Sequence, residues 1–240
     1  MPTSSSAGQP KLGNRLLDAL PAAVLRRLRP HLESVPLHRA QAIHAPGEKV
    51  EYAFFPTSGL ISLVAMTSDG PSVEIGMIGK EGMFSVSTIL GDETPSQRAM
   101  VQLAGGALRM PSRRLRQEVR ASAPLQELLL RYAQVTLTTA AQTAACNRLH
   151  QLERRFARWL LSVHDRAEAD TFQMTHEFLA MMLGVRRPGV TVAAQSLQAG
   201  GVIAYNHGTM TVMDRGGLET AACECYRAIQ DEFARLLGRA

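Results

Sequence analysis

Apolar residues change their spacing twice along the chain, and these changes divide it into three parts. Between residues 12 and 32 they recur at helical three- and four-residue steps, and Pro21 interrupts the run, so we expect two short amphipathic helices. From about Val35 to Pro111 the apolar runs are short and are separated by turns that contain glycine or proline. Many short strands at close spacing indicate a sandwich or a barrel.

The third part begins with a long helix. Neither proline nor glycine occurs between Pro124 and Cys146, and apolar residues recur along one narrow side of the predicted helix. This stripe fits two interpretations: a core helix of one chain, or a seam that pairs with a second copy of the chain. The second interpretation predicts a dimer interface formed by Leu125, Leu128, Leu129, Tyr132, Val135 and Thr139.

Two further helices are predicted downstream. One extends from about Leu149 to Val163, with Arg154, Arg155 and Arg158 on the side opposite its apolar residues, where we expect them to be solvated. The other runs from Asp214 to Leu237 and closes the chain.

Composition narrows the class of protein. The chain has 240 residues, of which 45% are hydrophobic and 20% charged, and this excludes a disordered chain and a disulfide scaffold. The formal net charge of +5 permits a polyanionic partner without requiring one. No run of about eighteen apolar residues is present, and three cysteines fit a reducing compartment. We expect a soluble, cytoplasmic protein without a structural disulfide and without a membrane partner.

Sequence motifs of enzymes are absent. The chain contains no GxxxxGK[ST], GxGxxG, GxSxG or HExxH segment, and its seven histidines do not form an HxH or HxxxH pair. Cys223 and Cys225 fall in the predicted final helix, where residues two apart point to nearly opposite sides and cannot chelate one ion. We therefore expect no catalytic residue, no cofactor and no metal.

The segment from Thr175 to Leu197 has the spacing of a helix-turn-helix. Thr175 is a good helix N-cap, and Gly184 permits the sharp turn that brings a second helix across the first. In such a motif the N-terminal end of the second helix carries side chains into the major groove of DNA. Two short strands around Asn206-His207-Gly208 follow, and this hairpin makes the unit a winged helix. We predict base contacts by Arg186, Arg187 and Thr191, and backbone contacts by Thr175, His176 and His207.

The order of β domain, pairing helix and winged helix resembles the Crp/Fnr family of bacterial transcription regulators. The segments that carry the resemblance are Asn14 to Pro21, Pro46-Gly47-Glu48, Phe55 to Ser62, Ile78 to Met83, Arg154 to Leu161 and the helix-turn-helix. The resemblance implies an α+β fold with an N-terminal jelly-roll like cyclic nucleotide-binding domains (12–122), a dimerisation helix (123–146) and a winged helix-turn-helix (147–240). It also implies a homodimer on a palindromic double-stranded operator, with RNA polymerase and a small-molecule effector of unknown identity as partners.

The chain departs from the family pattern at the effector site. Nucleotide-binding members use a Gly-Glu pair for the ribose and a downstream arginine for the cyclic phosphate. Here Gly82 precedes Met83, and the arginine is Arg98, so we predict an effector site at these three residues that does not take cyclic AMP. The N-terminal cysteine cluster of iron–sulfur members is also missing, because residues 1–120 contain no cysteine.

Two other hypotheses remain open at this stage. The chain could be a ligand or redox sensor that acts through protein contacts, with Cys146 as the reactive thiol, although Cys146 also fits a small buried residue. An enzyme built on the β domain would lack an assembled nucleophile, base or metal set.

Overall fold

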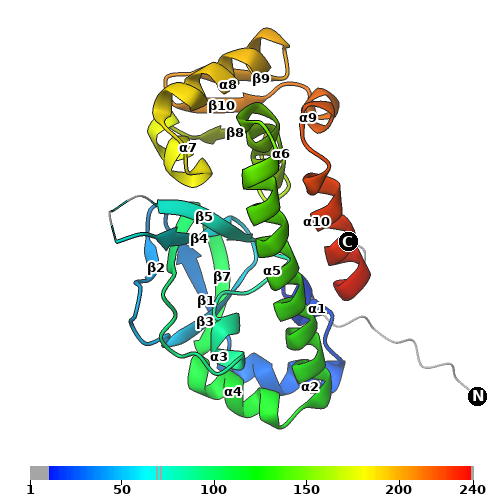
Figure 1. The fold of residues 1–240 in the computed structure, drawn as a ribbon. Coiled ribbons are helices and arrows are strands. Elements are labelled where there is room, and N and C mark those ends of the chain that lie inside the picture. The colour runs from blue at the N-terminus through cyan, green and yellow to red at the C-terminus, as the bar shows by residue number, and fades with distance from the viewer. Residues whose placement is uncertain (1–10, 69, 71, 239–240) are drawn as a thin grey trace, which may run out of the picture.

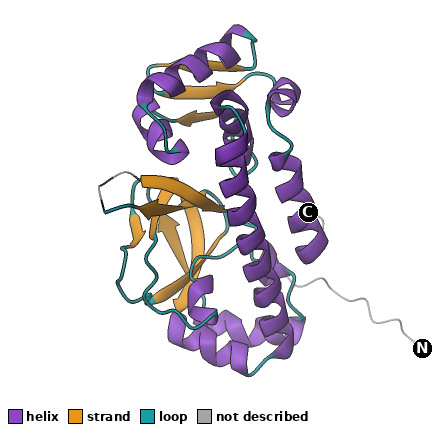
Figure 2. Ribbon diagram, in the orientation of Figure 1, coloured by secondary structure: helices purple, strands orange, loops and turns teal. Residues whose placement is uncertain are grey.

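A computed structural model describes residues 11–68, 70 and 72–238 of the protein. It has two lobes joined by one long helix, α5 (Ala123–Leu149), which runs from the lower lobe to the upper one (Figure 1). Strands gather in the lower lobe, and a smaller sheet lies under the helices of the upper lobe (Figure 2). The expected α+β fold is confirmed.

Two short helices enter the lower lobe, as the spacing predicts: α1 (Arg15–Asp18) and α2 (Ala22–Leu28), the latter continued by the 3-10 helix η1 (Arg29–His31). Asn14 caps α1 and also donates hydrogen bonds from its amide to the carbonyl oxygens of Pro56 and Gly82, both at 2.9 Å. The entry helices are therefore fixed to the β domain.

The β domain is a roll of two antiparallel sheets, ordered β1-β7-β3 and β2-β6-β4-β5. Apolar side chains from both sheets fill the space between them. The strands are β1 (Glu33–Leu37), β2 (Ala42–His44), β3 (Tyr52–Pro56), β4 (Leu60–Met66), β5 (Ser72–Ile78), β6 (Arg98–Leu103) and β7 (Gly105–Pro111).

Helix α5 follows two shorter helices, α3 (Val86–Ile89) and α4 (Ser112–Arg120). Its apolar stripe faces the same chain: five of the six residues predicted for the dimer interface are buried, and all of these except Val135 belong to the core of the lower lobe. They are Leu125, Leu128, Leu129, Tyr132 and Val135. The prediction that these five contact a second copy is wrong, because a side chain that is buried within its own chain has no surface left for a partner. The sixth, Thr139, is half-buried beside the cavity described below.

The upper lobe is a winged helix with one three-stranded sheet, ordered β8-β10-β9. Its core is built from helices α6 to α9 and the sheet. The elements are α6 (Leu152–His164), β8 (Thr171–Gln173), α7 (His176–Leu183), α8 (Arg187–Ala199), β9 (Ile203–Asn206), β10 (Thr209–Val212), α9 (Arg215–Ala221) and α10 (Cys225–Leu237).

The arginine face of α6 differs from the prediction. Arg155 and Arg158 keep only 9% and 7% of their surface exposed, whereas Arg154 is exposed. The Arg155 guanidinium donates to the carbonyl oxygen of Leu183 at 2.7 Å, so it joins α6 to α7. The prediction that Arg155 and Arg158 are solvated is wrong, because the rest of the chain covers α6 on several sides.

The end of the chain also differs. The helix expected from Asp214 to Leu237 is broken, and Cys223 lies in the turn between α9 and α10. Cys223 and Cys225 therefore do not lie on the same helix. The geometric argument that they cannot bind one metal ion together does not apply. Helix α10 runs beside α5 (Figure 1).

Among the described residues, no helix combines the length and the apolar character that crossing a bilayer requires.

Candidate functional site

The turn between α7 and α8 is built by a capped helix start and a glycine. The Thr175 hydroxyl accepts a hydrogen bond from the Phe178 amide at 3.2 Å, which confirms the predicted N-cap. Gly184 ends α7 with φ at +64°, a conformation that side chains rarely adopt. A β-carbon there would also approach Val73 of β5 to 3.0 Å. The glycine is thus required by the turn and by the contact with the β domain.

Helix α8 has one buried and one exposed face. Its buried face contributes four side chains to the upper core: Val190, Ala193, Ala194 and Leu197. Arg186 and Arg187 lie exposed at the N-terminal end, and Pro188 occupies the first turn, where its missing N–H is tolerated. This end of α8 therefore presents two guanidinium groups to solvent.

Sequence reasoning missed two residues on the exposed face of α8. Val192 is 66% exposed, and Gln195, one turn further along, is also exposed. Val192 follows Pro188 by four residues and Gln195 follows it by seven, so the 3.6-residue periodicity of the predicted helix places all three on the same side and could have identified them.

His176 ties the helix-turn-helix to the wing. Its Nδ1 lies 3.0 Å from the hydroxyl of Thr191 on α8, and its ring stacks on Tyr205 of β9 with the ring centroids 4.2 Å apart. Burial lowers the pKa of His176, and the nearby Arg187 charge lowers it further. The imidazole is therefore neutral near pH 7 and braces α7, α8 and the wing together.

The structure brings several of the six residues predicted to contact DNA close together. Thr191 and His176 are joined by the hydrogen bond above, and Gly208 at the wing turn lies beside Thr175. His207 is exposed at the tip of that turn, in the left-handed region with φ at +46°. The hydroxyls of Thr175 and Thr191 already have partners within the protein, so their roles as DNA contacts stay predictions.

The three residues predicted for the effector site are not gathered in one pocket. Gly82 lies against Tyr132, whose hydroxyl donates to the Met83 carbonyl oxygen at 3.2 Å, and the Met83 side chain is buried in the lower core. Arg98 is exposed at the start of β6, where it pairs with Val64 of β4. In the described part of the chain no interaction links Arg98 to the other two. An effector site at these residues stays a prediction.

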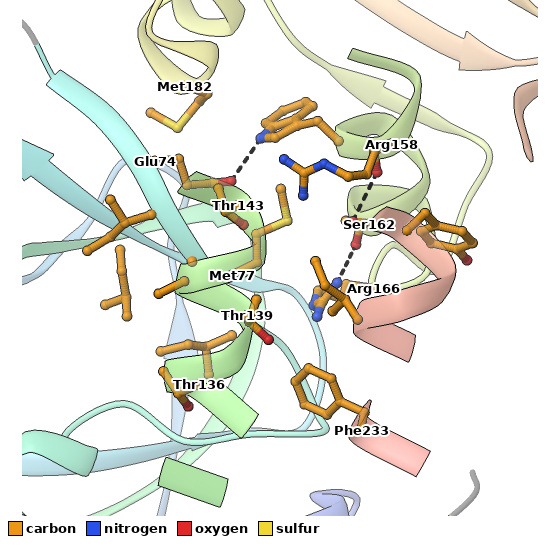
Figure 3. A pocket seen from close by; sticks show the side chains of 18 of the residues that line it. Glu74, Met77, Thr136, Thr139, Thr143, Arg158, Ser162, Arg166, Met182 and Phe233 are labelled. Atoms are coloured by element: carbon orange, nitrogen blue, oxygen red, sulfur yellow. Dashed lines mark hydrogen bonds between the residues drawn. The ribbon is translucent and has the colours of Figure 1, made fainter. Parts of the chain in front are cut away.

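A cavity of about 120 Å³ lies instead where the two lobes meet, between β5, α5, α6 and α10. Figure 3 shows polar and apolar groups projecting into it from all four elements. Its volume is below the roughly 300 Å³ at which pockets for drug-sized ligands begin, so a nucleotide would not fit without opening it. The labelled lining residues are Glu74, Met77, Thr136, Thr139, Thr143, Arg158, Ser162, Arg166, Met182 and Phe233.

Glu74 is the central polar group of this cavity. Its Oε1 accepts a hydrogen bond from the indole N–H of Trp159 at 2.8 Å, and its Oε2 has no partner. Burial raises the pKa of Glu74 to about 7, although the neighbouring Ser62 hydroxyl, the hydrogen bond from Trp159 and the charges of nearby arginines oppose the rise. The β domain and the winged lobe are thus joined through a carboxyl that titrates near neutrality.

Comparison with known protein families finds a match in the upper lobe. Residues 154–221 match the family of Crp-like helix-turn-helix domains. No curated protein sequence matches the chain significantly.

The whole fold resembles solved regulators. A Crp/Fnr-family regulator from Eubacterium rectale is 18% identical, with a TM-score of 0.69 over 86% of this chain and 96% of that one. A CRP/FNR-family transcriptional regulator from Thermus thermophilus is 22% identical, with a TM-score of 0.66 over 79% and 98%. The c-di-GMP-responsive global regulator CLP of Xanthomonas campestris is 17% identical, with a TM-score of 0.66 over 80% and 99%. The resemblance predicted from the sequence is confirmed for the fold and for the helix-turn-helix domain.

Proposed function

We propose that the chain, whose residues 154–221 form a Crp-like helix-turn-helix domain on a Crp/Fnr-like fold, is a dimeric, sequence-specific DNA-binding regulator. The observation that carries the proposal is α8, which presents two arginines and a polar and apolar stripe to solvent at the end expected to enter the major groove. The protein acts in the cytoplasm, where its operator is found.

The exposed face of α8 supports specific assignments. Arg186 and Arg187 are suited to phosphates or to a bidentate contact with guanine. Val192 offers an apolar surface to a thymine methyl group, and Gln195 offers an amide that pairs with adenine. Thr191, held by His176, acts by fixing the orientation of α8 as well as by reaching the groove. The operator is therefore expected to contain both types of base pair in each half-site.

Backbone contacts come from the start of α7 and from the wing. Thr175 and His176 stand at the N-terminus of α7, where amide groups attract a phosphate, and His207 is exposed at the tip of the wing. These contacts position the protein on the duplex and carry no sequence information.

The dimer interface is reassigned to the opposite side of α5. Leu130 and Leu137, seven residues apart, are 46% and 66% exposed, and Ala144 continues the same line. Small residues flank them at the half-buried Ala133 and the exposed Ala141 and permit close approach of a second helix. Because α5 has 27 residues and is about 40 Å long, such a stripe is long enough to pair two copies.

The interdomain cavity is the proposed effector site in place of Arg98, Gly82 and Met83. A small ligand that hydrogen-bonds Glu74 would compete with Trp159, and so would alter how the winged lobe rests on the β domain. Cyclic AMP is not expected as this ligand, because the cavity is smaller than a nucleotide requires.

The test is selection of a randomised duplex library on the purified protein at moderate salt. We expect enrichment of a two-fold symmetric site with half-sites about one helical turn apart. Arg187→Ala is expected to weaken binding of the selected duplex by about 1–3 kcal/mol and to relax preference at one base pair per half-site. Leu137→Glu, outside the DNA interface, is expected to give monomers by sedimentation and to lose the symmetric site. Retention without enrichment of any sequence would contradict the proposal.

A further inference from the structure

All three cysteines of the chain meet one histidine at the upper end of α5. The Sγ atoms of Cys146 and Cys223 are 3.4 Å apart, and the Sγ atom of Cys225 is 3.5 Å from Nδ1 of His150. These four ligand atoms all lie within 4.8 Å of one another, although they come from two segments more than seventy residues apart. We call this set the cysteine–histidine cluster.

The size of the cluster fits a single tetrahedral ion. Zinc–sulfur bonds of about 2.3 Å in a tetrahedron place neighbouring sulfurs about 3.8 Å apart, close to the spacing of this cluster. An iron–sulfur centre, which inserts its own iron and sulfide atoms between the ligands, would need a wider set. Three thiolates and one imidazole are a donor set typical of structural zinc.

The surroundings of the cluster are arranged as around a bound metal. His150 directs Nδ1 at the cluster, and its other ring nitrogen, Nε2, lies 3.0 Å from a carboxylate oxygen of Glu224. Ligating histidines in proteins usually donate their second N–H to such a group, which fixes the tautomer and the ring orientation. The amide of Gln142 donates to the Cys225 sulfur at 3.0 Å, as expected where a sulfur carries negative charge.

The local charge also favours a thiolate centre. A zinc ion with three thiolates and a neutral imidazole has a net charge of −1. Arg155 and Arg158 are both buried, interact electrostatically with the cysteines and form no ion pair with a carboxylate in the described part of the chain.

We propose that Cys146, Cys223, Cys225 and His150 bind one zinc ion. The ligands come from the last turn of α5, from the two-residue link between α5 and α6, from the turn before α10 and from the first residue of α10. The bound ion therefore fixes the angle at which α6 and the winged lobe leave α5. This consequence for DNA binding rests on the proposed function, whereas the metal site itself does not.

The test measures metal without DNA. Full-length protein, purified with a phosphine reductant and dialysed against zinc, is expected to hold about one zinc per chain by elemental mass spectrometry. Cobalt added to the metal-free protein is expected to give the visible d–d bands of a tetrahedral site and a thiolate charge-transfer band. Reduced wild-type protein that retains no zinc and gives no such bands would overturn the proposal, as would a native Cys146–Cys223 disulfide that zinc does not prevent.

Variants separate ligation from folding. Cys223→Ser is expected to abolish zinc retention, and Glu224→Gln to weaken zinc affinity about 10- to 100-fold by loosening His150. His150→Cys preserves four donors, so it should keep tetrahedral cobalt bands with stronger charge transfer even if other variants unfold. His164→Ala is the matched control, because His164 also pairs with a carboxylate, Asp170 at 2.7 Å, but lies outside the cluster. Loss of zinc by His164→Ala equal to that of Cys223→Ser would contradict the assignment.

The link to DNA is measured separately. Zinc-loaded protein is expected to bind the selected duplex more tightly than metal-free protein, and Cys223→Ser to bind equally with and without zinc. If zinc binds but leaves DNA affinity unchanged, the metal site stands and its role in orienting the winged lobe is wrong. If the protein binds zinc but selects no DNA, the proposed function fails while the site remains.

Discussion

Helix α6 carries the winged lobe, and two chemically different junctions hold it. On one side, Trp159 donates to the buried carboxyl Glu74 of β5, and Arg166 forms an ion pair with Glu81 at 2.7 Å. At its start, the cysteine–histidine cluster joins the end of α5 to the turn before α10. The first junction links α6 to the β domain, and the second links it to the long helix.

The two junctions respond to different conditions. The carboxyl junction depends on packing around a large aromatic side chain and on protons, because Glu74 titrates near neutrality. The thiol junction depends on metal and on the redox state of its sulfurs. The same helix can therefore be repositioned from either side, and variants that alter one junction while sparing the other measure each contribution.

Truncation at the carboxyl junction is expected to have the largest effect. Trp159→Ala removes a buried ring and leaves Glu74 without its hydrogen-bond donor, so it should lower the free energy of unfolding by about 3–5 kcal/mol in urea titrations. Trp159→Phe keeps most of the ring and should cost clearly less. Equal losses for the two variants would show that packing contributes little at this junction.

The second prediction concerns pH. Because the folded carboxyl of Glu74 keeps its proton up to about pH 7 while the unfolded one releases it near pH 4.5, stability should fall as pH rises through that window. The shift corresponds to about 3 kcal/mol. Glu74→Gln, which keeps an oxygen to accept from Trp159, should remove this dependence and stabilise the protein at pH 8. A parallel pH profile for the variant and the wild type, measured by chemical denaturation, would rule out Glu74 as its source.

Metal removal breaks the other junction. A chelator should lower the free energy of unfolding by about 2.7 kcal/mol if free zinc initially stands at 100 times its dissociation constant. Glu74→Gln should show the same chelator effect, since the junctions are separate. Cys223→Ser should show none, and a chelator response in that variant would assign the metal to another place.

The smallest effect is expected at the wall of the cavity. The Thr139 hydroxyl is buried without a partner, so Thr139→Val should be neutral or stabilise by up to about 1 kcal/mol. The Thr136 hydroxyl donates to the Tyr132 carbonyl oxygen at 2.9 Å, and Thr136→Val serves as the control that loses a hydrogen bond. Thermal unfolding compares the two, and a loss at Thr139 that exceeds the loss at Thr136 would show that the cavity holds an ordered partner.

Local signals in the sequence were enough to predict the winged helix. The N-cap Thr175, the turn at Gly184 and the basic start of α8 each depend on neighbouring residues only, and the structure confirms the elements that they predict. The change in the spacing of apolar residues along the chain likewise predicted the order of the lobes.

Features that depend on distant segments could not be predicted in the same way. The stripe on α5 was read correctly as apolar, but only the tertiary fold decides that Leu129 faces the chain's own β domain and Leu137 faces outward. Arg155 is buried because α7 covers it, and Glu74 is buried because α6 does. For the cluster, the four-residue step from Cys146 to His150 is a local signal, but only the fold brings Cys223 and Cys225 to these two residues.

The central claim is that a dimer of this chain reads a DNA sequence. The most direct measurement is a fluorescence anisotropy titration of the zinc-loaded protein with its selected duplex and with a scrambled duplex of the same length, at several salt concentrations. Tighter binding of the selected duplex by about 10³-fold or more, with both affinities falling steeply with salt, is the predicted result. Equal affinity for the two duplexes at every salt concentration would contradict the account.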